Sequence, residues 1–68
     1  MGPERHLYRI TEAMHLLSMS RSVIYEQLRA GRLHSVKQGR ARLIPATAIR
    51  HYVELLIHES EGANGEAA

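Results

Sequence analysis

The segment Ser20–Gly31 constrains the fold of this chain most, because it carries both the start and the stop signal of one short helix. Ser20 suits the N-cap, since its hydroxyl can accept hydrogen bonds from the free N–H groups of the first turn. Gly31 can adopt the left-handed conformation that ends a helix. Ile24 and Leu28 lie one turn apart and can anchor the helix to a core. The segment therefore predicts a short helix held by two apolar residues.

The remaining surface of this helix is polar and cationic. It carries Arg21, Ser22, Tyr25 and Arg29. A helix of this size fits the major groove of DNA. Arg21 stands where the helix dipole disfavours a cation, which favours contact with a base or phosphate over simple solvation. Tyr25 either fills the core or faces the groove, and its rotation by ~100° from Ile24 favours the groove.

Length and composition bound the function classes. The chain has 68 residues, which allows one small domain with a marginal core. It has no cysteine, which excludes disulfides and thiol chemistry and fits a reducing cytoplasm. No apolar run approaches the ~20 residues of a membrane span, and no signal-peptide pattern opens the chain. We expect a soluble cytoplasmic protein without a membrane partner.

The charges are distributed unevenly, although the formal net charge is only +2. From Met19 to Arg42 there is one acid, Glu26, whereas no Lys or Arg follows Arg50. The basic residues of this central zone are Arg21, Arg29, Arg32, Lys37, Arg40 and Arg42. They predict a polyanionic partner for the middle of the chain, and a solvated charged surface is the alternative.

The N-terminal third predicts an arm, a strand and a helix. Residues 1–6 are expected to be a flexible arm, and Leu7–Ile10 alternates as a short strand does. Thr11 is the expected N-cap of a first helix, with Glu12 favourably placed in its first turn. The expected buried stripe of this helix, which ends near Leu17, consists of Ala13, Leu16 and Leu17. Two short helices joined by about three residues form a helix-turn-helix unit.

A β-hairpin is predicted between Leu33 and Ile44. Gly39 and Arg40 can form its two-residue turn. The resulting register pairs Val36 with Leu43, Lys37 with Arg42 and Gln38 with Ala41. It places two cations directly opposite each other, which is unfavourable unless both side chains reach into water or a phosphate lies between them. Both alternatives stay open.

The C-terminal third predicts one helix and a tail. Pro45 is expected to end the strand and open a helix from about Ala46 to Glu59. The apolar stripe of this helix consists of Ile49, Tyr52, Val53 and Leu56. Residues 60–68 are polar and glycine-rich, and we expect a disordered tail there. The folded domain is therefore predicted over residues 7–59.

The sequence shows no pattern typical of catalysis or metal binding. It has five histidines, but none are paired at i, i+4 on a helix, and no clustered carboxylates complete a site. No Ser, His and Asp grouping suggests nucleophilic catalysis. We therefore expect no enzyme activity, no metal and no cofactor.

Strand, helix-turn-helix, hairpin and helix is the order of a small α+β winged helix-turn-helix domain, with three helices and a β-hairpin wing. Its most specific motifs are Leu7–Ala13, Met19–Tyr25, Ala30–Leu33, the Gln38–Arg40 turn and Ile44–Pro45. These motifs resemble the excisionase family of DNA-binding proteins, which is related to the MerR-type winged helix. The resemblance covers about residues 7–56.

The resemblance implies that the second helix enters the major groove of double-stranded DNA, while the wing contacts the minor groove or the adjacent backbone. The implied recognition-helix residues are Ser20, Arg21, Ser22, Tyr25 and Arg29, the last as a phosphate contact. The implied wing residues are Lys37, Arg40 and Arg42.

The implied function is that of a recombination directionality factor, which binds and bends attachment-site DNA and helps an integrase of the tyrosine recombinase type in excision. Further copies of the protein are expected on the same DNA, in a bacterial, phage or plasmid setting near the nucleoid. A small winged-helix transcriptional regulator is the alternative within DNA binding. A protein-interaction or antitoxin-like module is the alternative of another class, and Leu55 and Ile57 leave room for it.

Overall fold

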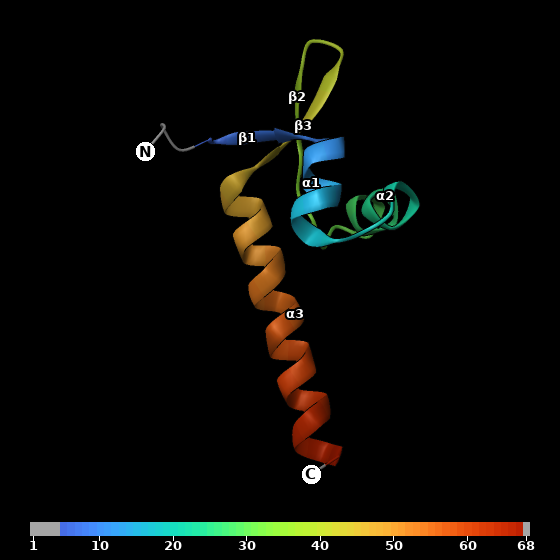
Figure 1. Ribbon diagram of the computed structural model, residues 1–68, viewed down its shortest axis with the longest axis vertical. Helices are drawn as coiled ribbons and strands as arrows, with labels where there is room; N and C mark the ends of the chain where they lie inside the picture. Colours follow the sequence, from blue (N-terminus) through green and yellow to red (C-terminus); the bar gives the residue numbers. More distant parts are fainter. Residues whose placement is uncertain (1–4, 68) are drawn as a thin grey trace.

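The chain folds into an α+β domain with three helices and a three-stranded antiparallel sheet (Figure 1). In this computed structural model the backbone is described over residues 5–67 and the side chains over residues 5–62. The elements are β1 (Leu7–Arg9), α1 (Ile10–Leu17), α2 (Arg21–Arg29), β2 (Val36–Gln38), β3 (Ala41–Pro45) and α3 (Ala46–Ala67). The predicted order of strand, two helices, hairpin and helix is confirmed.

The sheet has the order β1-β3-β2, so β3 is its central strand. The predicted hairpin register is confirmed, with Lys37 opposite Arg42. Gly39 opens the turn at φ +62°, a left-handed conformation that glycine adopts without strain. The other neighbour of β3 is β1, with Tyr8 opposite Ile44. The hairpin projects from the body at the end opposite the C-terminus of α3 (Figure 1).

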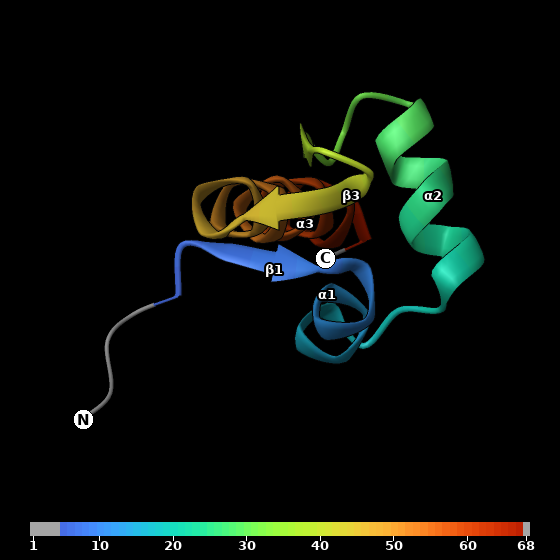
Figure 2. The same cartoon turned by 90° about the horizontal axis from the view of Figure 1, so that it is seen from above.

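The helix-turn-helix unit has a tight connection. Ser18 ends α1 in the left-handed region at φ 55°, and the N–H of Met19 donates to the Met14 carbonyl over 2.9 Å. Ser20 is the N-cap of α2, as predicted, because its hydroxyl accepts from the Val23 N–H. Gly31 follows α2 at φ 78° and supplies the predicted stop. Seen from above, α2 stands at the edge of the body beside the other elements (Figure 2).

The start of α1 differs from the prediction. Thr11 is not the N-cap: the helix begins at Ile10, and Arg9 occupies the cap position. The Glu12 carboxylate accepts from the Arg9 N–H over 2.8 Å, which satisfies a donor at the helix start. The first turn is therefore closed by a side chain within the helix.

The core lies between the helices and the sheet. Its buried residues are Ile10, Ala13, Ile24, Leu33, Ile44, Ala48 and Tyr52. Two members of the predicted stripes lie outside it, since Leu16 is 55% and Val53 37% exposed. The inner line of α3 runs through Ala48 and Tyr52, one turn apart, and Val53 is rotated ~100° from Tyr52.

The last helix is longer than predicted. It continues to Ala67 rather than ending near Glu59, so the predicted tail, residues 60–68, begins within α3. No proline interrupts this stretch, and Gly62 in a helix interior costs only about 1 kcal/mol relative to alanine. Residues 1–4 of the predicted arm lie outside the described residues, whereas the His6 carbonyl accepts from the Ala46 N–H over 2.9 Å.

Candidate nucleic-acid interface

The outer surface of α2 is cationic and accessible. Arg21, Ser22 and Arg29 are exposed, and neither arginine has an ion-pair partner within residues 5–62. Ser20 caps the helix through a bond of 3.3 Å from the Val23 N–H, and its Oγ lies 3.3 Å from Oγ of Ser22. Ser20 thus serves the helix start, while the two arginines stay available to an anion.

Tyr25 combines the two orientations that the sequence allowed. Its side chain is half-buried and packs against the core that contains Ile24. The rest of the residue remains accessible on α2. Tyr25 is therefore held in place by the core, and only part of it faces outward.

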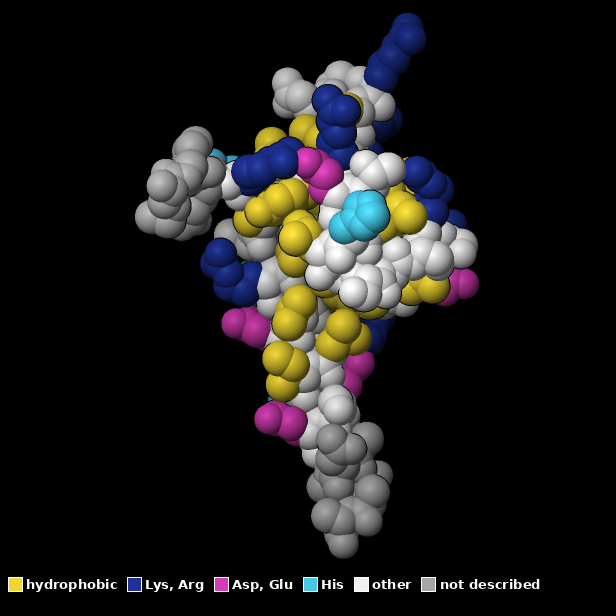
Figure 3. All heavy atoms as spheres, viewed as in Figure 1, with side chains coloured by type: hydrophobic (Ala, Val, Ile, Leu, Met, Phe, Trp, Pro, Cys, Tyr) yellow, Lys and Arg dark blue, Asp and Glu magenta, His cyan; other side chains and the backbone are white. Residues whose placement is uncertain are grey.

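The wing, β2 and β3 with their turn, carries the second group of cations. Lys37, Arg40 and Arg42 are all exposed. Gly39 and Arg40 form the turn, which places the Arg40 side chain at the end of the hairpin. Lys and Arg side chains gather over this end of the molecule, whereas acidic side chains flank the lower part of α3 (Figure 3). The positive charge thus faces away from the C-terminal end.

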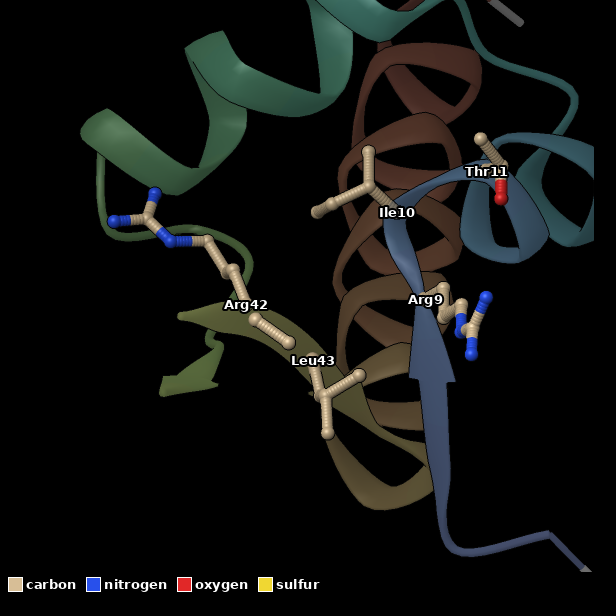
Figure 4. Close-up of a pocket in the computed structure, with 6 residues that line it drawn as sticks. Arg9, Ile10, Thr11, Arg42 and Leu43 are labelled. Atoms are coloured by element: carbon tan, nitrogen blue, oxygen red, sulfur yellow. The ribbon is translucent and has the colours of Figure 1, made fainter. Parts of the chain in front are cut away.

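A cleft of about 440 Å³ separates the wing from the start of α1. It is lined by Arg9, Ile10, Thr11, Ala41, Arg42 and Leu43. Arg42 extends from β3 toward α2, while Arg9 points to the opposite side of the cleft (Figure 4). Sequence reasoning did not select Arg9, because its place beside the wing depends on the pairing of β1 with β3 opposite Leu43.

Two other arginines are neutralised by glutamates. Arg32 makes a bidentate pair with Glu59, with Nη1–Oε2 and Nη2–Oε1 distances of 2.7 and 2.8 Å. Hydrogen bonding by Arg32 lowers the pKa of the Glu59 carboxyl. Nη1 of Arg5 lies 2.6 Å from Oε2 of Glu12, whose pKa is lowered first by the backbone N–H of Arg9 and then by Arg5.

The pairing of Arg32 with Glu59 changes the set of exposed cations that the sequence predicted. One of the six central cations is withdrawn from the surface charge, and five remain exposed without an ion-pair partner among residues 5–62. We call these five the free cations: Arg21, Arg29, Lys37, Arg40 and Arg42. They come from α2 and the wing, and outside this central zone Arg9 of β1 and Arg50 of α3 are also exposed without an ion-pair partner among residues 5–62.

The described part of the chain offers neither a metal site nor a membrane span. Within it, no group of three or more His, Cys, Asp or Glu residues could hold a metal ion. No helix of that part is long and apolar enough to cross a bilayer. The cationic surface of α2 and the wing is the candidate site.

A comparison with protein families decides what the two-helix unit is. The family described as a helix-turn-helix domain matches residues 7–54, from β1 into α3. The chain belongs to this helix-turn-helix family. It is accordingly a helix-turn-helix DNA-binding protein, and α2 is the second helix of its helix-turn-helix.

One relative gives a closer indication of the biological role. The helix-turn-helix chain is 38% identical over 61 residues to a protein of Saccharopolyspora erythraea named "Probable excisionase". The aligned part covers 90% of this chain and 62% of that relative, so the chain spans less than two thirds of the relative's length. The similarity to excisionases predicted from the motifs is confirmed. No solved structure matches the chain.

Proposed function

We propose that this protein is a sequence-specific excisionase, a recombination directionality factor that binds and bends attachment-site DNA and assists an integrase of the tyrosine recombinase type. The observation that carries the proposal is the concentration of the five free cations on α2 and the wing. The similarity to a probable excisionase selects this role among those open to a helix-turn-helix protein.

In this proposal α2 lies in the major groove. Arg21 reaches a base edge from the first turn, where guanine presents two acceptors that suit a bidentate guanidinium. Ser22 lies beside Arg21 in the first turn, the accessible part of Tyr25 lies one turn further on, and both line the groove. Ser20 presents the N-terminal end of the helix, and Arg29 in the last turn binds a backbone phosphate.

The wing binds the backbone next to the groove that α2 occupies. Lys37 and Arg42 are neighbours across the hairpin, and a phosphate between them removes their mutual repulsion. Arg40 extends the contact at the tip. Contacts at both α2 and the wing can offset a bending cost on the order of 1–6 kcal/mol. The wing thus supplies affinity and curvature rather than base reading.

The proposal includes further partners. Copies of the protein bind cooperatively at repeated sites, and the integrase assembles on the bent DNA. The protein acts in the cytoplasm of a bacterium, at the nucleoid, on a chromosomal, phage or plasmid element.

A second role within DNA binding is that of a small transcriptional regulator, which would use the same surface without an integrase. A protein-interaction or antitoxin-like role is favoured by one observation, the apolar surface on α3. Ile57 is 52% and Val53 37% exposed there, and Leu55 is half-buried.

A gel-shift assay tests the proposal, with duplexes tiled across the DNA that flanks the gene and a scrambled duplex of equal composition. The proposal predicts one preferred duplex, with the mobility anomaly of bent DNA, and excision by the neighbouring integrase that depends on this protein. Preference for a promoter duplex without any effect on excision would favour the regulator. No complex even at low salt would contradict DNA binding and favour a protein partner.

A further inference from the structure

The α3 helix contacts the segments that flank α2 on both sides. Tyr52 and Glu59 are seven residues apart, about two helical turns, and therefore lie on one face of α3. Tyr52 contacts the residue before the N-cap of α2, and Glu59 contacts a residue just beyond its C-terminus. One face of α3 thus holds both ends of the recognition helix.

The contact beyond the C-terminus of α2 is a three-residue network. Arg32 donates from Nε to Oε1 of Gln27, which lies on α2, over 2.7 Å. Its two terminal nitrogens donate to both carboxylate oxygens of Glu59. The Arg32 N–H also donates to the Gln27 carbonyl over 3.0 Å. Arg32 therefore binds α2 through its backbone and its side chain, and α3 through its side chain.

The contact before the N-terminus of α2 is made by a buried phenol. Tyr52 is 2% exposed, and its hydroxyl donates to Sδ of Met19 over 3.9 Å. Met19 immediately precedes the N-cap Ser20. Burial raises the pKa of the Tyr52 phenol, so the hydroxyl keeps its proton near neutral pH.

We propose that Tyr52 and Glu59 are positioning residues, which set the orientation of α2 for DNA through Met19 and Arg32. Arg32 then serves the recognition helix from inside the protein and is not a phosphate contact. This inference rests on the proposed DNA-binding function, and it adds the residues that orient α2.

An exposed ion pair alone would be weak support, since such pairs contribute little to stability. Three features distinguish the Arg32–Glu59 pair from an ordinary surface ion pair. It is bidentate, a geometry that fixes direction as well as distance. Its arginine is bound at the same time by Gln27 of α2. It also joins residues 27 positions apart, so it fixes tertiary rather than local structure.

The inference predicts a loss of preference between duplexes, which the change of charge alone does not produce. Glu59→Gln removes a negative charge, which by itself strengthens the attraction to DNA. If Glu59 orients α2, this variant instead loses preference for the target duplex over a scrambled one, by about threefold or more. Glu54→Gln is the matched control, because Glu54 is exposed on α3, makes no ion pair within residues 5–62, and undergoes the same charge change.

The salt dependence of DNA affinity shows whether Arg32 positions α2 or binds a phosphate. Each phosphate contact contributes about 0.9 to the slope of log affinity against log salt. Arg32→Gln is expected to lower affinity for the target duplex and leave this slope unchanged, whereas Arg40→Gln lowers the slope. The double variant Arg32→Glu, Glu59→Arg restores the pair in reverse and is expected to recover part of the lost preference.

The deciding experiment combines these binding assays with amide NMR of the free proteins. The inference predicts that Glu59→Gln alters residual dipolar couplings of α2 relative to β3, while Glu54→Gln does not. A fall of the salt slope in Arg32→Gln, or unaltered couplings in a folded Glu59→Gln, would overturn it. Failure of the parent protein to prefer any duplex would count against the proposed function, and the couplings would still decide the positioning role.

Discussion

Lys37 and Arg42 lie directly opposite each other on β2 and β3, so the wing holds two like charges at one position of its ladder. Neither has an acidic partner in the part of the chain that the structure describes. The arrangement is unfavourable in the free protein and favourable when a polyanion is bound. This contrast between the free and the bound state is testable.

The variant Lys37→Glu converts the like pair into an opposite pair. We expect it to stabilise the free protein by about 0.2–1 kcal/mol, because cross-strand pairs contribute on this scale. The same change should weaken binding to every duplex. Thermal unfolding and a binding titration measure the two effects on one sample.

The control for this variant is Arg40→Glu. Arg40 lies in the turn and has no cross-strand partner in the register. It should weaken DNA binding without the gain in stability. Equal stabilisation by both variants would refute the interpretation of the Lys37–Arg42 pair.

The variant Arg21→Ala tests base reading by α2. Loss of a guanidinium at a base edge is expected to cost about 1–3 kcal/mol on the target duplex and to relax sequence preference. The fold should persist, since Arg21 is exposed. Competition titrations with target and scrambled duplexes give the preference directly, and an undiminished ratio would remove Arg21 from the groove.

The variant Ser20→Ala tests how far α2 depends on its cap. Removing the hydroxyl that accepts from the Val23 N–H should cost about 1 kcal/mol of stability. Ser20→Asp is expected to retain the cap. If the alanine variant unfolds at the same denaturant concentration as the parent, the cap contributes nothing.

The pairing of Glu59 with Arg32 makes stability depend on pH. Hydrogen bonding by Arg32 lowers the pKa of the Glu59 carboxyl from its ordinary value of 4.5, so Glu59 binds a proton less readily in the folded protein than in the unfolded chain. The stability contribution is therefore complete above pH 4.5 and is lost as the pH falls through the folded-state pKa. Urea unfolding between pH 7 and pH 3 should show a shallower decline for Glu59→Gln than for the parent.

Local signals explain what the sequence predicted well. The cap at Ser20, the stop at Gly31 and the turn at Gly39 each depend on residues within one or two turns of chain. The hairpin register followed from the turn alone. The free cations were visible for the same reason, because they stand on elements that local signals define.

Contacts between distant segments explain what the sequence did not predict. Nothing in the local pattern links Arg32 to Glu59 or pairs β1 with β3, and these contacts decide that Arg32 is neutralised and that Arg9 reaches the cleft. Val53 was placed in the core by the helical spacing of the apolar residues of α3, yet the buried line runs through Ala48 and Tyr52 and leaves Val53 37% exposed.

The slope of log affinity against log salt tests the central claim most directly, since that claim is contact between DNA and five free cations. If Arg29, Lys37, Arg40 and Arg42 each neutralise a phosphate of one duplex while Arg21 reads a base, the slope is expected at about −3.6, and at about −4.5 if Arg21 also neutralises a phosphate. Each single Gln variant of Arg29, Lys37, Arg40 or Arg42 should lower its magnitude by about 0.9. A flat salt response, or a slope that none of these variants changes, would contradict the account.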